Sequence, residues 1–124
     1  MVGATPTDVR VRVLRRALDD WISDYEVLGE FQAGGIPPEE AYAAMVGQTV
    51  DWIRRGVLVA GQMVDRGFTA WPATAGANAR RFADLAGRRS LLTQPGQICW
   101  FDTGPGVRGE LEWLSTRARE RRSH

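Results

Sequence analysis

The sequence predicts a single α+β domain of 124 residues. Several long segments place apolar residues at the three- and four-residue spacing of an amphipathic helix, whereas shorter segments between glycine and proline turns are rich in β-branched and aromatic residues. With 44% apolar and 25% charged residues, the composition is that of a compact globular protein. We therefore expect one domain over residues 1–124, with residues 1–5 and 119–124 as flexible ends.

The first helix is expected to begin at Pro6 and to run to about Tyr25. Thr5 stands at the N-cap position, and Asp8 is placed to reach back towards it. Apolar side chains then recur at helical spacing and form one stripe, made by Val11, Leu14, Leu18, Trp21, Ile22 and Tyr25. Residues 27–36 hold three glycines, and we expect a turn there that includes one short helical turn.

A second long helix is predicted to follow Pro37. Proline favours the first helical turn, and the carboxylates of Glu39 and Glu40 would lie near the positive end of the helix dipole. The buried face of this helix is expected to carry Tyr42, Met45, Val46, Thr49 and Ile53. Gly56 is a natural residue to end it.

After Gly56 the apolar pattern changes from helical to strand-like. Residues 57–59 and 68–71 read as two strands joined through a turn at residues 65–67, so we expect a hairpin that ends at Pro72.

The rest of the chain predicts a helix, a strand and a final helix. The helix runs from Thr74 to about Gly87, and residues 97–102 form a short strand that adds to the hairpin. The final helix is marked by Val107, Leu111, Leu114 and Ala118. Residues 104–109 superficially match a GxGxxG phosphate loop, but Pro105 removes one backbone donor, so we interpret them as a tight turn.

The order of the first elements resembles that of a winged helix. Helix, short turn element, helix and hairpin follow one another over residues 6–71, and in that fold the second long helix recognises DNA while the hairpin is the wing. The resemblance implies a winged-helix-like core, extended here by a further helix, a short strand and a C-terminal helix.

A local resemblance is to small uncharacterised bacterial proteins. Three segments carry it, namely a PPEEA helix start at residues 37–41, a GF..W strand at 67–71 and a G.ICW..T..G segment at 96–106. It implies no catalytic residue, since none is assigned in such proteins.

Residue counts exclude several chemistries. Cys99 is the only cysteine and His124 the only histidine, which removes an internal disulfide, cysteine-based zinc sites, and Ser-His-Asp or Cys-His catalysis. No cofactor and no metal are expected. The N-terminal residues lack an apolar core of signal-peptide length and apolar runs are short, so we expect a cytoplasmic protein that does not enter a membrane.

The net charge of +1 conceals two unlike halves. Residues 1–62 hold six arginines and nine acidic residues, whereas residues 63–124 hold ten arginines and six acidic residues. No basic residue lies between Asp19 and Asp51, where a winged-helix DNA reader would need positive charge. This acidic stretch is either a solvated face or a surface that binds a basic protein. The arginine-rich half would suit an anionic partner or simply solvate its helix ends.

Five tryptophans are a large number for this length. Trp21 and Trp52 fall on or beside predicted buried stripes, so we expect both in the core. Trp100 alternates with Cys99 and Phe101 in its strand, and one of the two sets must face outward unless both sheet faces are covered. A partly exposed Trp100 beside an acidic face would suit protein docking.

These observations favour a non-enzymatic protein-binding module. Its specific form would be an immunity protein that occludes a basic toxin. The residues expected to bind the partner are Asp19, Asp20, Asp24, Glu26, Glu30, Glu39, Glu40 and Trp100. The alternative is a winged-helix DNA-binding regulator that uses Arg54, Arg55 and Arg66. An enzyme that works through carboxylates alone is a third, weaker hypothesis.

Overall fold

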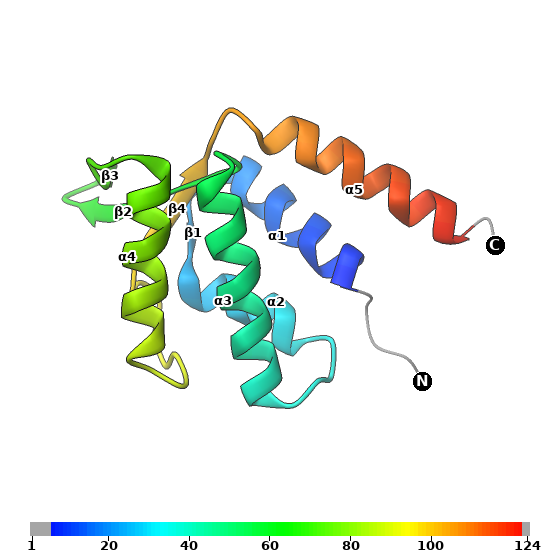
Figure 1. Ribbon diagram of the computed structural model, residues 1–124, viewed down its shortest axis with the longest axis horizontal. Coiled ribbons are helices and arrows are strands. Elements are labelled where there is room, and N and C mark those ends of the chain that lie inside the picture. The colour runs from blue at the N-terminus through cyan, green and yellow to red at the C-terminus, as the bar shows by residue number, and fades with distance from the viewer. Residues whose placement is uncertain (1–5, 123–124) are drawn as a thin grey trace.

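A computed structural model describes residues 6–122 and shows an α+β fold (Figure 1). The helices and strands follow one another along the chain as α1 (Pro6–Asp19), β1 (Ile22–Ser23), α2 (Asp24–Gln32), α3 (Pro38–Arg54), β2 (Leu58–Val64), β3 (Gly67–Ala70), α4 (Ala75–Gly87), β4 (Trp100–Thr103) and α5 (Val107–Arg122). The predicted fold class is therefore confirmed at the level of α+β.

The four strands form one antiparallel sheet in the order β1-β4-β2-β3. β4 pairs with β1 through Ile22 opposite Phe101 and with β2 through Ala60 opposite Phe101. β2 and β3 form the predicted hairpin, whose turn holds Asp65 at a φ of 57°. The late strand β4 thus lies between the earliest strand and the hairpin, whereas the sequence indicated only that it would join the hairpin.

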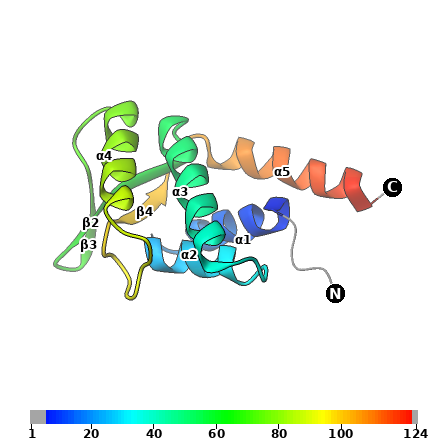
Figure 2. The same cartoon turned by 60° about the horizontal axis from the view of Figure 1, so that its bottom comes forward.

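The helices α3 and α4 lie on one face of the sheet, which we call the inner face (Figure 2). The Phe82 ring of α4 contacts the Phe101 ring of β4 at a centroid distance of 5.7 Å. The strand residues that point to this face, Ile22, Leu58, Ala60 and Phe101, are buried. α5 packs along α1, and together these helices extend away from the sheet (Figure 1).

The prediction that the first helix continues to Tyr25 is wrong. α1 ends at Asp19, and Ile22 and Ser23 leave the helix to pair with β4. Leu18 and Tyr25, both assigned to the buried stripe, are 39% and 42% exposed. Pairing with a strand from far along the chain therefore outweighs the local helical period.

The turn predicted at residues 27–36 is also wrong for most of its length. α2 occupies Asp24–Gln32, and Ser23 caps it with a complete capping box in which its side chain accepts from the Glu26 amide. Burial of Val27, Leu28 and Phe31 holds this short helix on the core. A single glycine in the helix, Gly29, is exposed and leaves the buried side intact.

Later elements agree more closely with the sequence. α3 ends where Gly56 adopts a φ of 74°, and its expected buried face is confirmed except for the half-buried Val46. Residues 104–106 form a tight turn, because the amides of Gly104 and Gly106 bond to the carbonyls of Val57 and Gly56.

The expected flexible ends fall partly outside the structure. Residues 1–5 and 123–124 lie outside the described residues, and α5 continues to Arg122. No helix within residues 6–122 combines the length and the apolar character needed to cross a membrane.

Candidate docking face

The outer face of the sheet, opposite Phe101, carries half-buried apolar side chains. Strand alternation places on it Val59, Met63, Phe68, Trp100 and Asp102, all of intermediate exposure. Trp100 thus points away from the fully buried Phe101, as the alternation in its strand indicated. Trp52 is buried as expected, but Trp21 is only half-buried, so its assignment to the core is wrong.

Trp21 belongs to this outer face. Its ring stacks on that of Phe68, with centroids 6.2 Å apart and an angle of 23° between the planes. Gly61 makes room for the stack, because a Cβ there would lie 2.6 Å from the Phe68 ring and would also meet the Thr69 carbonyl. The glycine in β2 therefore lets an aromatic side chain of β3 cross the sheet towards Trp21.

A second glycine positions Trp100. Gly96 has a φ of 78°, and a Cβ on it would lie 2.5 Å from the indole nitrogen of Trp100. The loop before β4 consequently packs directly against one side of the indole. This loop holds the Trp100 ring in place, and the side chain remains half-buried.

Carboxylates lie near two of these aromatic rings, those of Trp21 and Trp100. Asp19 and Asp20 are exposed just before Trp21, and the Asp20 carboxylate accepts the Trp21 amide at 2.8 Å. A hollow of about 230 Å³ beside Trp21 is lined by Arg16, Asp19, Asp20, Trp21, Ile22 and Glu26. Asp102 lies on the outer face next to Trp100 in β4. We call Asp19, Asp20, Trp21, Phe68, Trp100 and Asp102 the docking face.

The expectation that Asp24 lies on an acidic surface is wrong. Asp24 is fully buried, and its carboxylate accepts the amides of Gly96 at 2.7 Å, Ile98 at 2.6 Å and Cys99 at 3.4 Å. Burial raises the pKa of Asp24, and these hydrogen bonds oppose that shift. Asp24 fastens the loop before β4 to the start of α2 and is a structural residue.

Glu26 and Glu30 are neutralised by the first helix. Arg16 donates to Glu26 at 2.7 Å and to Glu30 at 3.1 Å, and Arg12 donates to Glu30 at 2.9 Å. The two glutamates of α2 and the two arginines of α1 therefore form an interhelical network. Of the pair, only Glu26 reaches the hollow beside Trp21.

Glu39 and Glu40 lie apart from the docking face. Both are exposed in the first turn of α3, which begins at the bottom of the view in Figure 1, whereas the β2–β3 hairpin lies at its upper left. The acidic stretch of the sequence therefore does not fold into one continuous surface. Of the expected binding residues, only Asp19, Asp20 and Glu26 line the hollow beside Trp21, and Trp100 lies on the outer face of the sheet.

The end of α3 is tied to α5 by hydrogen bonds from Trp52 and Arg55 to Glu110. Arg55 donates to both carboxylate oxygens of Glu110, at 3.0 and 2.8 Å, and to Asp51 at 2.6 Å. The indole nitrogen of the buried Trp52 also donates to Glu110, at 2.8 Å. Arg55, one of the arginines that the DNA-binding hypothesis requires, is thus engaged within the protein.

This network predicts acid sensitivity. Hydrogen bonds from Arg55 and Trp52 hold the pKa of Glu110 below its ordinary value, against the opposing effect of burial. Because the pKa is lower in the folded than in the unfolded state, the contribution of Glu110 to stability is present above the ordinary carboxyl pKa. That contribution is lost as the pH falls through the lowered value.

We expect the free energy of unfolding, measured by urea titration at a series of acidic pH values, to fall less steeply with decreasing pH in Glu110→Gln than in the wild type. Parallel pH dependences of the two proteins would show that Glu110 has no shifted pKa.

No metal centre is evident in the part of the chain that the structure describes. Residues 6–122 contain no group of three or more histidine, cysteine, aspartate or glutamate residues placed to hold a metal ion. The two buried acidic residues in that range, Asp24 and Glu110, both accept hydrogen bonds from the protein itself.

Sequence reasoning missed Phe68 and misplaced Trp21. The signal for Phe68 was present, because Phe68 and Ala70 alternate with Thr69 in the hairpin strand and Gly61 stands on the paired strand. Trp21 was hidden because it fits the helical stripe of the preceding residues.

Comparison with protein-family models, with curated proteins and with solved structures finds no significant match to this chain.

Proposed function

We propose that the protein is a non-enzymatic protein-binding module and that its docking face binds a basic surface of another protein. The observation that carries this proposal is the group of half-buried rings of Trp21, Phe68 and Trp100, bordered by carboxylates. None of the ion pairs described within residues 6–122 involves Asp19, Asp20 or Asp102.

Aromatic rings in a protected centre and charges at the rim are the features that give protein interfaces their affinity and their selectivity. Rim carboxylates attract a basic partner and disfavour an acidic one. In its specific form, the proposal is that the protein is an immunity protein. Its partner would be a basic nuclease-type toxin whose phosphate-binding groove the docking face covers.

The order of α1, β1, α2, α3, β2 and β3 supports a second candidate, a winged-helix DNA-binding regulator. In that case α3 would enter the major groove. The exposed side of α3 carries Glu39 and Glu40 near its start and then Ala43, Ala44 and Gly47. Such a surface repels phosphates and offers no arginine before the end of the helix, so we favour protein binding.

The experiment is calorimetric titration of this protein with any basic protein encoded beside its gene, together with an assay of whether that protein has nuclease activity that is blocked by binding. We expect tight binding and inhibition. Reversing the two rim charges with Asp19→Lys and Asp20→Lys should weaken binding about tenfold. Trp100→Ala should weaken it by about thirtyfold, as for an interface anchor, with circular dichroism showing that the variant folds.

A matched control is the double variant Glu39→Lys and Glu40→Lys, which changes the same charge at the start of α3. We expect it to bind within about twofold of the wild type, because those residues lie outside the docking face. A larger loss in this control than in the Asp19 and Asp20 variant would place the binding surface on α3. Absence of binding to the neighbouring basic protein would reject the immunity proposal.

A further inference from the structure

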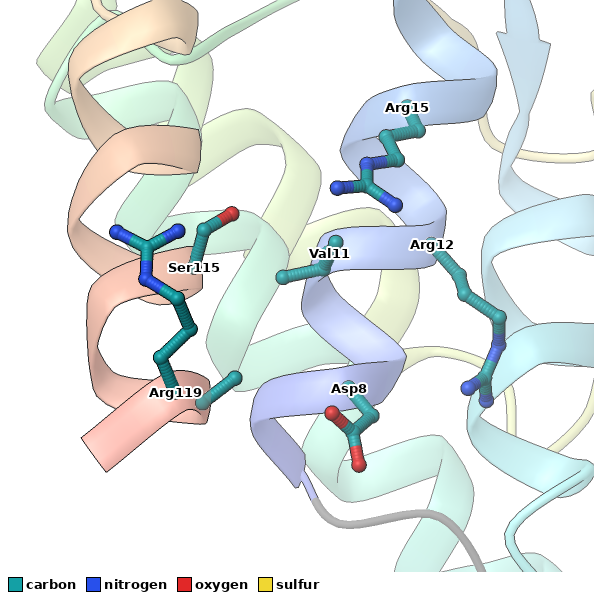
Figure 3. A pocket seen from close by; sticks show the side chains of 7 residues that line it. Asp8, Val11, Arg12, Arg15, Ser115 and Arg119 are labelled. Atoms are coloured by element: carbon teal, nitrogen blue, oxygen red, sulfur yellow. The ribbon is translucent and has the colours of Figure 1, made fainter. Parts of the chain in front are cut away.

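A groove between α1 and α5 gathers arginine side chains from both helices. It encloses about 330 Å³ and is lined by Asp8, Val11, Arg12, Arg15, Ser115, Ala118 and Arg119. Figure 3 shows Arg15 reaching from α1 towards α5, where Ser115 and Arg119 lie along the facing helix, with Val11 between the two helices. This groove is formed by other elements than the docking face.

The arginines of the groove differ in their other contacts. Arg12 extends to the far side of α1, where Glu30 accepts from it at 2.9 Å (Figure 3). Arg119 donates to the hydroxyl of Thr116 at 3.3 Å. Arg15 takes part in none of the hydrogen bonds or ion pairs described within residues 6–122, although it is one residue from the strongly paired Arg16. Its guanidinium group therefore offers its donors to the groove.

Arg15 and Arg119 line the groove from facing helices, so an anion between these helices would be attracted from both sides. Guanidinium groups bind phosphate oxygens through paired, charge-assisted hydrogen bonds, and a serine hydroxyl supplies a further donor. Asp8, also in the lining, lies on the side of Val11 away from Arg15 (Figure 3). We infer that the groove between α1 and α5 binds the phosphate group of a small molecule through Arg15, Ser115 and Arg119.

The test uses the full chain and pyrophosphate, with sodium chloride added to the reference so that ionic strength is matched. Calorimetric titration should show saturable binding to one site per chain. Arg15→Gln and Arg119→Gln should each weaken it about tenfold, the loss expected for one charge-assisted contact. Both residues are exposed, so their variants should melt at the wild-type temperature when no phosphate is present.

Arg80→Gln is the matched control, because Arg80 is an exposed arginine on α4 and not part of the groove lining. An equal loss in this control, or no binding beyond that of chloride, would overturn the assignment. Orthophosphate, phosphoserine and adenosine monophosphate distinguish the sources of the phosphate group, and binding of any of them that is lost in Arg15→Gln supports the site. Tighter binding of duplex DNA than of pyrophosphate, lost in the same variants, would instead favour the DNA-binding regulator.

Discussion

Replacing Asp24 with alanine should lower the free energy of unfolding by about 3–5 kcal/mol, because three backbone amides in the loop before β4 lose their acceptor. The carboxylate lies where water does not reach it, so nothing replaces it for the amides of Ile98 and Cys99. Asp24→Asn should lower the free energy of unfolding by less, because the side-chain oxygen of asparagine still accepts from backbone amides. Its NH2 group, however, would face an amide donor.

Urea unfolding followed by circular dichroism measures this loss. Asp84→Ala provides a control, because Asp84 is an exposed carboxylate on α4 and its removal should change stability by no more than about 0.5 kcal/mol. Hydrogen exchange provides a second readout, in which the amides of Gly96 and Ile98 should exchange faster in the alanine variant. A loss below about 1 kcal/mol in Asp24→Ala would mean that the carboxylate does not hold the loop.

Gly61→Ala is the second substitution for which we expect a large effect. The new methyl group would meet the Thr69 carbonyl and the Phe68 ring, and the backbone of β3 cannot move away without breaking its pairing with β2. We expect a loss of about 3 kcal/mol in the free energy of unfolding, at the upper end of the range for overpacking. Displacing Phe68 should also change the fluorescence of Trp21, because their stacking would be lost.

Gly47→Ala is its control. Gly47 lies in α3 with no atom within 4 Å of the added methyl group, so the same change there should leave stability unchanged or raise it by up to about 1 kcal/mol. Denaturant unfolding of the two variants compares a crowded glycine with an open one. Equal stabilities of the two variants would show that Gly61 is not required for the close approach of β3.

The parts of the fold that the sequence predicted correctly have local causes. Pro38 with Glu39 marks the start of α3, and Gly56 marks its end through a backbone conformation that glycine adopts easily. The error at the end of α1 has a non-local cause, whereas α2 begins with a capping box between Ser23 and Glu26 that is local in the sequence. Ile22 and Ser23 become a strand because Phe101 and Trp100 lie beside them, and no pattern near residue 22 reports that partner.

The sequence predicts the parts of the candidate site that depend on the alternation of side chains along a strand. It does not predict which carboxylates are buried, paired or exposed. Alternation in β4 correctly placed Trp100 on the side opposite Phe101. A carboxylate reads the same in the sequence whether it is exposed, as Asp20 is, paired, as Glu30 is, or buried, as Asp24 is. The charge count therefore indicated an acidic region but could not separate its structural members from those that remain accessible.

The position of β4 determines when the sheet can be completed during synthesis. β1 is paired only with β4 within the described sheet, and Asp24 finds its donors in the segment just before β4. A chain emerging from the ribosome can form the β2–β3 hairpin early, but β1 has no neighbour until residue 103 has been made. Folding of the sheet should therefore be a late, long-range event that waits until residues 100–103 have been made.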